Sequence, residues 1–487
     1  MIPTTIRRPA EIILGFLFVL AACSGNGDNP TAATDTTIET GARSTSTTIE
    51  SAVPTETQPP ASGASEPRYA TQDATVLFDQ RSVHRFDIDL DDEALDQLDD
   101  DPAAEEYVEG SLTFDGETLE QVGVRYKGSV GAFLGCTEGP NPLQPSGAKT
   151  CPKLSIKLKL NWAGTDTEFY GQRKIQLHSM NNDPSLIRER LGYLLFAEAG
   201  VPAPRASHAR VVINGDFIGL FALVEQIDGR FTRDRFDDGS GNLYKEVWPF
   251  TDTGEVRSAD ALFDGLKTNE DDDPSAEIIQ SFAREILATQ ATTDESAARR
   301  ILTERTDLDS FVAYAVVDRA INHDDGPFHW YCPSSCEPHN YYLYEEPASG
   351  KIHVIPWDLD NALRNWTPND TNPIAAFTKI ADSFGETSND CLPFPFGPLN
   401  VPQRSAACDP LVATWALLVD EFERTDAAFR SGPFSIDNVS VLVQSWRAQI
   451  APYVAEAAAA DPTAPSVESW NAAVDQLLAD IAAEPSR

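Results

Sequence analysis

Hydrophobic and polar residues alternate along several short segments in the first half of the chain, which is the pattern of half-buried β-strands. The pair Asn214-Gly215 between two apolar runs adds a hairpin signal. A short acidic helix is predicted over 91–98, after the first strand. The predicted strands cover residues 83–90, 107–114, 121–127, 154–160, 211–213 and 217–224.

Further along the chain, apolar residues recur at helical spacing. The first such helix is expected to start at Asn182-Asp183-Pro184, with a side-chain acceptor at the cap and proline in the first position. More helices are predicted over 278–290, 293–304 and 308–322, and again beyond Asp420. Because strands come first and helices later, we expect an α+β fold rather than a doubly wound parallel sheet.

The N-terminus has the pattern of an export signal. Arg7 and Arg8 precede an apolar run over 12–20 that is too short to span a bilayer. The tetrad Leu20-Ala21-Ala22-Cys23 resembles the lipobox of bacterial lipoproteins, which predicts lipidation of Cys23. A plain signal peptide with an incidental cysteine is the alternative. We therefore expect a lipid-anchored protein on the extracytoplasmic face of a bacterial cell membrane.

The amino-acid composition changes along the rest of the chain and indicates how it is divided into parts. The segment after Cys23 is rich in Ser, Thr, Pro, Ala and Gly and has almost no large apolar residue, so it is predicted to be a flexible tether. The expected parts are a signal peptide at 1–23, the tether at 24–72, a globular domain at 73–430 and a helical extension at 431–487.

Cysteine usage agrees with export. Setting Cys23 aside leaves six of the seven cysteines, grouped in three local pairs, and no Cys-x-x-Cys motif is present. A structural zinc site would need such motifs, so disulfides in an oxidising compartment are the better explanation. The expected pairs are Cys136 with Cys151, Cys332 with Cys336, and Cys391 with Cys408.

Charge is strongly unbalanced. The 487 residues hold 37 Lys and Arg against 76 Asp and Glu, a net charge of −39, which excludes a nucleic-acid partner held through a broad basic face. Only ten of the cations are lysines, and six of these lie between Lys127 and Lys174. This local surplus of positive charge suggests a bound anion. The alternative for Lys157 and Lys159 is that they form the solvated face of an amphipathic strand.

Candidate chemistry gathers between residues 322 and 360. Segments 341–345 and 351–355 are strand-like, and folding them as a hairpin places residue 345 opposite residue 352. Asn340 then lies beside Asp358 and Asp360, and either Asp324 or Asp325 can complete the group. Converging oxygen ligands of this kind are what Mg²⁺ or Mn²⁺ with a bound polyphosphate requires.

The order Asp, Asn, hairpin, Asp also follows the logic of kinase catalysis, in which a remote lysine contacts phosphate oxygens. No glycine-rich Gly-x-Gly-x-x-Gly, Walker or His-Arg-Asp sequence is present, so an ordinary protein kinase is excluded. His323, His339 and His353 match no compact zinc motif.

Eight stretches in this order resemble the CotH (spore-coat protein H) kinase-like family, over about residues 83 to 429. Each stretch alone is only modest evidence for this family, but the set in this order is highly specific for it. The matching stretches are 122–129 (VGVRYKGS), 153–157 (KLSIK), 182–190 (NDPSLIRER), 200–204 (GVPAP), 213–215 (ING) with Gly219 and Glu225, 241–245 (GNLYK), 339–344 (HNYYLY) and 356–360 (PWDLD).

The resemblance implies an atypical, secretory-type protein kinase that uses ATP and a divalent metal to phosphorylate serine on exported or surface proteins. It implies that Asp358 binds metal and that the Asp of the family's Asn-x-Asp-Gly segment is the catalytic base. Here that segment is one residue longer, so Asp324 and Asp325 both remain candidates. An insertion with Cys332 and Cys336 also separates it from Asn340, and a disulfide across the insertion would restore the geometry.

We therefore expect metal at Asn340, Asp358 and Asp360. The residues expected to contact the nucleotide are Arg125, Lys127, Lys153, Lys157, Lys159, Arg188, Glu225 and Lys245. Arg188 can equally be a surface charge, and Glu225 can equally belong to a structural salt bridge. Two other functions stay open, a non-catalytic surface-binding or adhesion protein that kept the fold and a metal-dependent hydrolase.

Overall fold

The structure is a computed structural model that describes residues 67–128, 130–133, 135–141, 144–270, 272–292, 295–323, 325–363, 391–396 and 401–483. The predicted signal peptide with Cys23, the tether up to residue 66, and Asp324 lie outside the described residues. Both sheets and helices are present, which confirms the α+β class.

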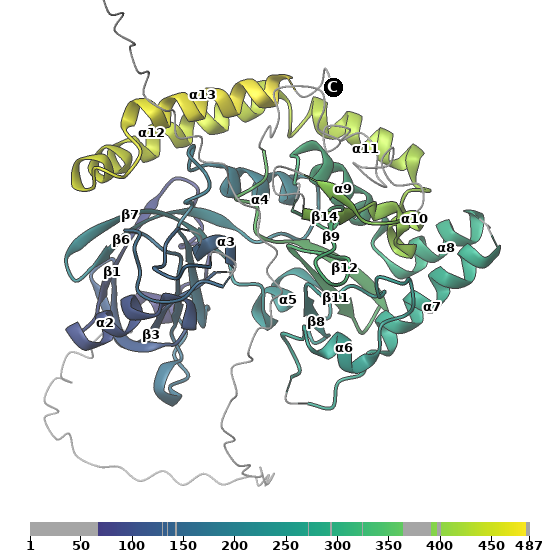
Figure 1. The fold of residues 1–487 in the computed structure, drawn as a ribbon, viewed down its shortest axis with the longest axis horizontal. Coiled ribbons are helices and arrows are strands. Elements are labelled where there is room, and N and C mark those ends of the chain that lie inside the picture. Colours follow the sequence, from purple (N-terminus) through teal and green to yellow (C-terminus); the bar gives the residue numbers. More distant parts are fainter. Residues whose placement is uncertain are drawn as a thin grey trace, which may run out of the picture.

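The N-terminal part is a closed barrel with the strand order β1-β2-β3-β4-β5-β7-β6 (Figure 1). Its interior is filled by the apolar positions of the alternating strands, such as Phe86, Val124 and Leu158. Strand β5 was not among the predicted strands. The seven strands are β1 Val83–Asp89, β2 Val108–Phe114, β3 Glu117–Tyr126, β4 Ile156–Lys159, β5 Lys174–His178, β6 Ala206–Ile213 and β7 Asp216–Val224.

Short helices cover the barrel: α1 Arg68–Thr71, α2 Asp92–Asp100 and α3 Val130–Phe133, with 3-10 turns at Pro102–Ala104 and Trp162–Gly164. The backbone N–H of Arg68 donates to Glu117 at 2.9 Å, and that of Tyr170 donates to the Tyr69 carbonyl at 2.8 Å. Residues 67–72, which were predicted to belong to the tether, therefore pack on the barrel.

Helix α4 spans Arg188–Glu198 and begins later than predicted. The reason is the carboxylate of Asp183, which accepts the backbone N–H groups of Ser185, Ile187 and Arg188 and so closes a separate turn. Leu186 within this turn has a left-handed φ of 60°, which no α-helix accommodates. Asp183 thus satisfies the first donors of the helix from outside it.

The second part of the chain surrounds two small sheets with helices (Figure 1). One sheet has the order β12-β11-β8 and the other β10-β9-β14-β13. The strands are β8 Leu243–Lys245, β9 Trp330–Tyr331, β10 Glu337–Pro338, β11 Tyr341–Glu346, β12 Lys351–Pro356, β13 Phe394–Phe396 and β14 Val401–Arg404. The helices are α5 Gly229–Arg235, α6 Ala259–Phe263, α7 Glu277–Thr292, α8 Glu295–Arg305, α9 Leu308–Ala320, α10 Pro410–Trp415 and α11 Val419–Ser431, with a 3-10 turn at Ala406–Cys408.

Two C-terminal helices, α12 Ile436–Ala460 and α13 Val467–Ala483, lie across the barrel near β7 and α4 (Figure 1). The indole N–H of Trp470 donates to the Ser185 carbonyl at 2.9 Å, directly before α4. Arg190 of α4 donates to Gln449 at 2.8 Å and lies 4.2 Å from the centre of the Trp446 ring. The predicted helical extension therefore shares a core with α4.

The three expected disulfides are present, Cys136–Cys151, Cys332–Cys336 and Cys391–Cys408. Among the helices of the described chain, none has the length and apolar character needed to span a membrane.

Candidate functional site

The hairpin of β11 and β12 forms in the predicted register, with Glu345 opposite Ile352. At its open end the backbone N–H of Trp357 donates to the Asn340 carbonyl at 3.1 Å, so Asn340 and Asp358 lie next to each other. Both residues adopt left-handed backbone conformations, with φ of 56° and 51°. Asn and Asp tolerate this region better than other side chains, which fits their place at the end of the hairpin.

The insertion between residues 325 and 340 folds as a small hairpin of β9 and β10, closed by Cys332–Cys336. It returns the chain so that the side-chain amide of Asn340 donates to the Asp325 carboxylate at 2.8 Å. Asn340 and Asp325 are therefore in contact in spite of the insertion. Asp324, the other candidate base, lies outside the described residues.

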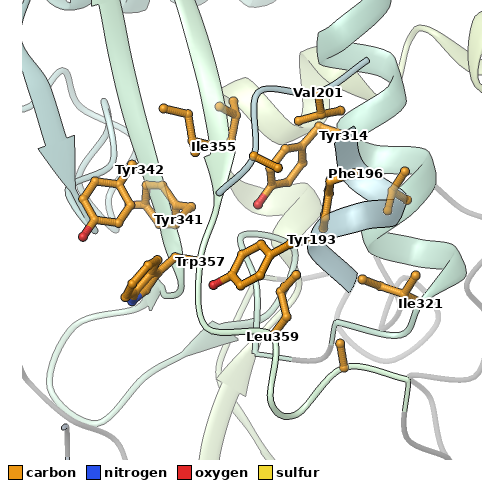
Figure 2. Packing of buried hydrophobic residues seen from close by; sticks show 14 of the residues in the cluster. Tyr193, Phe196, Val201, Tyr314, Ile321, Tyr341, Tyr342, Ile355, Trp357 and Leu359 are labelled. Atoms are coloured by element: carbon orange, nitrogen blue, oxygen red, sulfur yellow. The ribbon is translucent and has the colours of Figure 1, made fainter. Parts of the chain in front are cut away.

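Asp358 and Asp360 lie on the loop after β12, which packs against α4. The backbone N–H of Asp358 donates to the Tyr193 hydroxyl at 3.0 Å, and Figure 2 shows that hydroxyl directed toward the segment with Trp357. Gly192 permits this close packing, since a Cβ there would come within 2.8 Å of Leu359. The amide of Asn182 donates to Asp360 at 3.2 Å. Helix α4 and the turn before it thus fix the backbone of Asp358 and the carboxylate of Asp360.

These carboxylates concentrate negative charge. The pKa of Asp360 is raised well above its ordinary value, first by burial and then by the neighbouring charges of Asp358, Glu189 and Asp325. In the described residues, no three His, Cys, Asp or Glu side chains already form a metal-binding cluster. The oxygen donors nevertheless fit a hard divalent cation, because a cation would offset the mutual repulsion that raises this pKa.

Among the lysines predicted to contact the nucleotide, Lys127 lies near the carboxylate of Asp358. Its ammonium lies 2.7 Å from His178 Nε2 and 5.4 Å from the centre of the Trp357 ring. An ammonium can only donate, so Nε2 accepts, and Nδ1 carries the proton that bonds to Glu189 at 2.6 Å. Burial lowers the pKa of Lys127 to about 8, and the charges of Asp358 and Glu189 partly oppose this shift.

Further cations lie on and beside β8, which pairs with β11 of the hairpin. Lys245 of β8 lies opposite Tyr342 in the ladder, and its ammonium is 3.6 Å from Glu246. Glu246 in turn accepts the backbone N–H of Asn340 at 3.1 Å. Lys267, which the sequence interpretation missed, bonds through its backbone N–H to the Leu243 carbonyl, and its pKa is lowered by burial and then by Lys245.

Arg125, Lys157 and Lys159 lie on the outward face of β3 and β4, since the alternate residues point into the barrel. Arg125 is opposite Lys157 in the ladder and forms an ion pair with Glu105 at 2.5 Å. Lys159 lies near the rings of Tyr107 and Trp162 instead, 5.9 and 6.0 Å from their centres. Lys157 lies on the same outward face of the barrel as Lys127, because Lys157 is opposite Arg125 and Arg125 and Lys127 are alternate residues.

Three other expected residues make different contacts. The Lys153 ammonium donates to the Leu220 carbonyl at 3.0 Å and lies 5.1 Å from the centre of the Phe221 ring, so the barrel wall contacts it and not the carboxylate group. Glu225 forms ion pairs with Arg205 at 2.5 Å and Arg235 at 2.8 Å. It therefore belongs to a structural salt bridge, the alternative to a role at the nucleotide. Arg188 contacts Asp183, with 3.5 Å between Nε and Oδ1.

Several site residues were missed from the sequence. His178 ends a strand that was not predicted, and Asn182, Glu189 and Glu246 contact the site from separate elements. The alternation Lys174-Ile175-Gln176-Leu177-His178 was a signal for strand β5.

Comparisons with known proteins relate this chain to one family. A family model described as CotH kinase protein matches residues 124–483. Inner spore coat protein H of Bacillus subtilis (strain 168) is 25% identical over 203 residues, covering 39% of this chain and 50% of that protein. An inner spore coat protein H-like protein of the same strain is 36% identical over 67 residues, covering 14% of this chain and 21% of that protein. The chain thus matches half or less of the length of each relative.

Proposed function

Because the chain belongs to the CotH kinase family, we propose that it is an atypical protein kinase that transfers the γ-phosphoryl group of ATP to serine on exported or surface proteins. The observation that supports this most is one group of contacts: the Asn340 amide bonds to Asp325, the Asn340 carbonyl accepts the N–H of Trp357 directly before Asp358, and the Lys127 ammonium lies over the Trp357 ring. A carboxylate, an amide, a second carboxylate and a lysine are the parts that phosphoryl transfer uses.

In this proposal Lys127 binds phosphate oxygens, assisted by Lys245 and Lys157. The bond from His178 to Glu189 fixes the imidazole, and the imidazole orients the ammonium. Asp358, Asp360 and Asn340 would hold Mg²⁺ or Mn²⁺, which when bound neutralises charge on the transferring phosphate.

The acceptor serine oxygen attacks the γ-phosphorus, the bond to the β–γ bridging oxygen breaks, and ADP leaves. Asp325 takes the proton of the serine hydroxyl. Its carboxylate is held by Asn340, and burial raises its pKa, which favours proton uptake. A barrel part and a helical part that meet at this group support a kinase-like fold.

The proposed location is the extracytoplasmic face of the bacterial membrane, with a lipid on Cys23. The three disulfides support an oxidising compartment. The two relatives are coat proteins by name, which agrees with a place at a cell or spore surface.

Calorimetry with ATP and Mn²⁺ followed by a transfer assay tests the function. Binding together with labelling of protein supports a kinase. Binding without transfer identifies the non-catalytic alternative, and release of free phosphate without protein labelling identifies a hydrolase. No binding at all contradicts the nucleotide site.

A further inference from the structure

Tyr193 lies on helix α4 and makes two hydrogen bonds through its hydroxyl, with only 1% of the residue exposed. The hydroxyl oxygen accepts the backbone N–H of Asp358 at 3.0 Å, and its hydrogen is donated to the Glu189 carboxylate in a long bond of 3.5 Å. Figure 2 shows the Tyr193 ring reaching from α4 toward the segment with Trp357 and Leu359. One hydroxyl therefore joins Glu189, one helical turn earlier, to the loop that follows β12.

Glu189 is also the carboxylate that fixes the lysine of the site. Its Oε1 atom accepts from Tyr193 and from the Nδ1–H of His178, which lies at 2.6 Å. The Nε2 atom of His178 in turn accepts from the Lys127 ammonium at 2.7 Å. Glu189 is 1% exposed, so these bonds lie in a region of low dielectric, where they are strong. The contacts thus form one row, from Lys127 through the helix to the backbone of Asp358.

The loop with Asp358 is packed closely around this bond. Trp357 and Leu359, on either side of Asp358, are 5% and 0% exposed. Asp358 itself has a left-handed φ of 51°, a conformation that persists in a residue with a side chain only where the surroundings hold it. The bond from its N–H to Tyr193 is one such constraint. The backbone that carries the Asp358 carboxylate is thus held by a hydroxyl from another element.

On the basis of the metal-binding role proposed above for Asp358, we propose that Tyr193 is a positioning residue for the divalent cation. It holds the loop so that the Asp358 carboxylate can coordinate the metal. Hydrogen-bond partners that orient a metal ligand typically cost about 10- to 100-fold in metal affinity or activity when they are lost. The bond between His178 and Glu189 does not involve the phenol, so Lys127 is expected to keep its place without the hydroxyl.

The test uses the full chain and Tyr193→Phe, which keeps the ring and removes the hydroxyl. Electron paramagnetic resonance measures Mn²⁺ binding in the presence of a non-hydrolysable ATP analogue. We expect the Kd for Mn²⁺ to rise about 10- to 100-fold. Transfer from ATP to the protein itself and to dephosphorylated casein is measured over a range of Mn²⁺ concentrations. The rate is expected to fall at low Mn²⁺ and to return to within about threefold of the wild type at saturating Mn²⁺, with a similar KM for ATP.

Tyr244→Phe is the matched control. Tyr244 is 0% exposed, and its hydroxyl makes the same two kinds of bond on strand β8. It accepts the side-chain amide N–H of Asn242 at 3.1 Å and donates to the carboxylate of Glu345 at 3.0 Å. The variant therefore removes a buried hydroxyl between an N–H and a glutamate, but not at the loop with Asp358. We expect it to bind Mn²⁺ as the wild type does.

An unchanged Kd for Mn²⁺ in Tyr193→Phe, an equal rise in Tyr244→Phe, or a loss of rate that saturating Mn²⁺ does not restore would overturn the positioning role. If the wild type transfers phosphate in such a case, the proposed function still stands. Weaker Mn²⁺ binding by Tyr193→Phe alone, with no transfer by the wild type, would support the role of Tyr193 and contradict the proposed kinase activity. A wild type that binds no Mn²⁺ contradicts both.

Discussion

The side-chain amide of Asn340 donates to the carboxylate of Asp325 at 2.8 Å, although fifteen positions separate the two residues in the chain. The intervening insertion forms its own disulfide-closed hairpin and returns to the site. An insertion at this point therefore leaves the candidate base and the candidate metal ligand in contact.

This contact leads to a prediction about the base. Asp325→Asn removes the proton acceptor while keeping the size of the side chain. We expect the transfer rate to fall about 10²- to 10⁴-fold with little change in KM for ATP. Asp324→Asn, measured in the same assay, is expected to show a smaller fall in transfer rate. The reverse order of the two losses would assign the base to Asp324.

The pKa of Lys127 gives a pH prediction. A lysine usually keeps its charge far above neutral pH, but burial lowers this pKa to about 8, so the ammonium loses its proton as pH rises through that value. Because the neutral amine attracts phosphate less, kcat/KM for ATP is expected to fall above about pH 8. Lys127→Arg keeps its charge and is expected to remove this fall. Identical profiles for the two proteins would assign the change to another group.

Glu345 predicts a pH dependence of stability. Burial raises its pKa from 4.5 to about 7, and the carboxyl accepts from Asn242, Tyr244 and the backbone of Ile279. The folded state binds the proton more tightly than the unfolded state. Between these two pKa values the free energy of unfolding therefore falls as pH rises, by up to about 3 kcal/mol for this group.

Urea unfolding at pH 5 and pH 8 measures this effect. Glu345→Gln is expected to lack most of this fall, so it gains stability relative to the wild type at pH 8. Asp409, whose pKa burial raises to about 6, contributes in the same direction in both proteins. Glu277→Gln, at an exposed glutamate, is the control and is expected to behave as the wild type. A parallel pH dependence of Glu345→Gln and the wild type would contradict the assignment.

The C-terminal helices should stabilise the region before α4. Trp470 is 1% exposed and bonds to the Ser185 carbonyl, so Trp470→Ala leaves both a cavity and an unpaired carbonyl. We expect a loss of about 3–5 kcal/mol in the free energy of unfolding. Val441→Ala on α12, where the side chain is 72% exposed, is expected to change it by less than about 0.5 kcal/mol. Similar losses in both variants would contradict this role.

Local pattern was sufficient for much of the fold and for the hairpin of the site. The strand-like segments 341–345 and 351–355 predicted the register of β11 and β12, and that register placed Asn340 beside Asp358. The grouping of the cysteines indicated all three disulfides. These features depend on residues that are close in sequence.

Contacts between distant elements were not predictable in the same way. The lysine density of residues 153–159 suggested that all three lysines there contact the nucleotide, but closure of the barrel directs Lys153 to the Leu220 carbonyl. Asp183 was interpreted as the cap of a helix starting at Pro184, but its carboxylate closes a separate turn and accepts the N–H of Arg188, where the helix begins. His178 gave no motif, because its partner Glu189 is identified only in the folded chain.

The most direct test of the proposed kinase activity is transfer of label from γ-labelled ATP to protein, with and without Mn²⁺, by the wild type and by Asp358→Asn. The backbone N–H of Asp358 makes the bond to Tyr193, so this variant keeps that contact. Asp426→Asn, at an aspartate paired with Arg430 on α11, is the matched control. We predict metal-dependent labelling by the wild type and the control, and a loss of at least about 100-fold in Asp358→Asn. Equal labelling by the wild type and Asp358→Asn would contradict the assignment of this site.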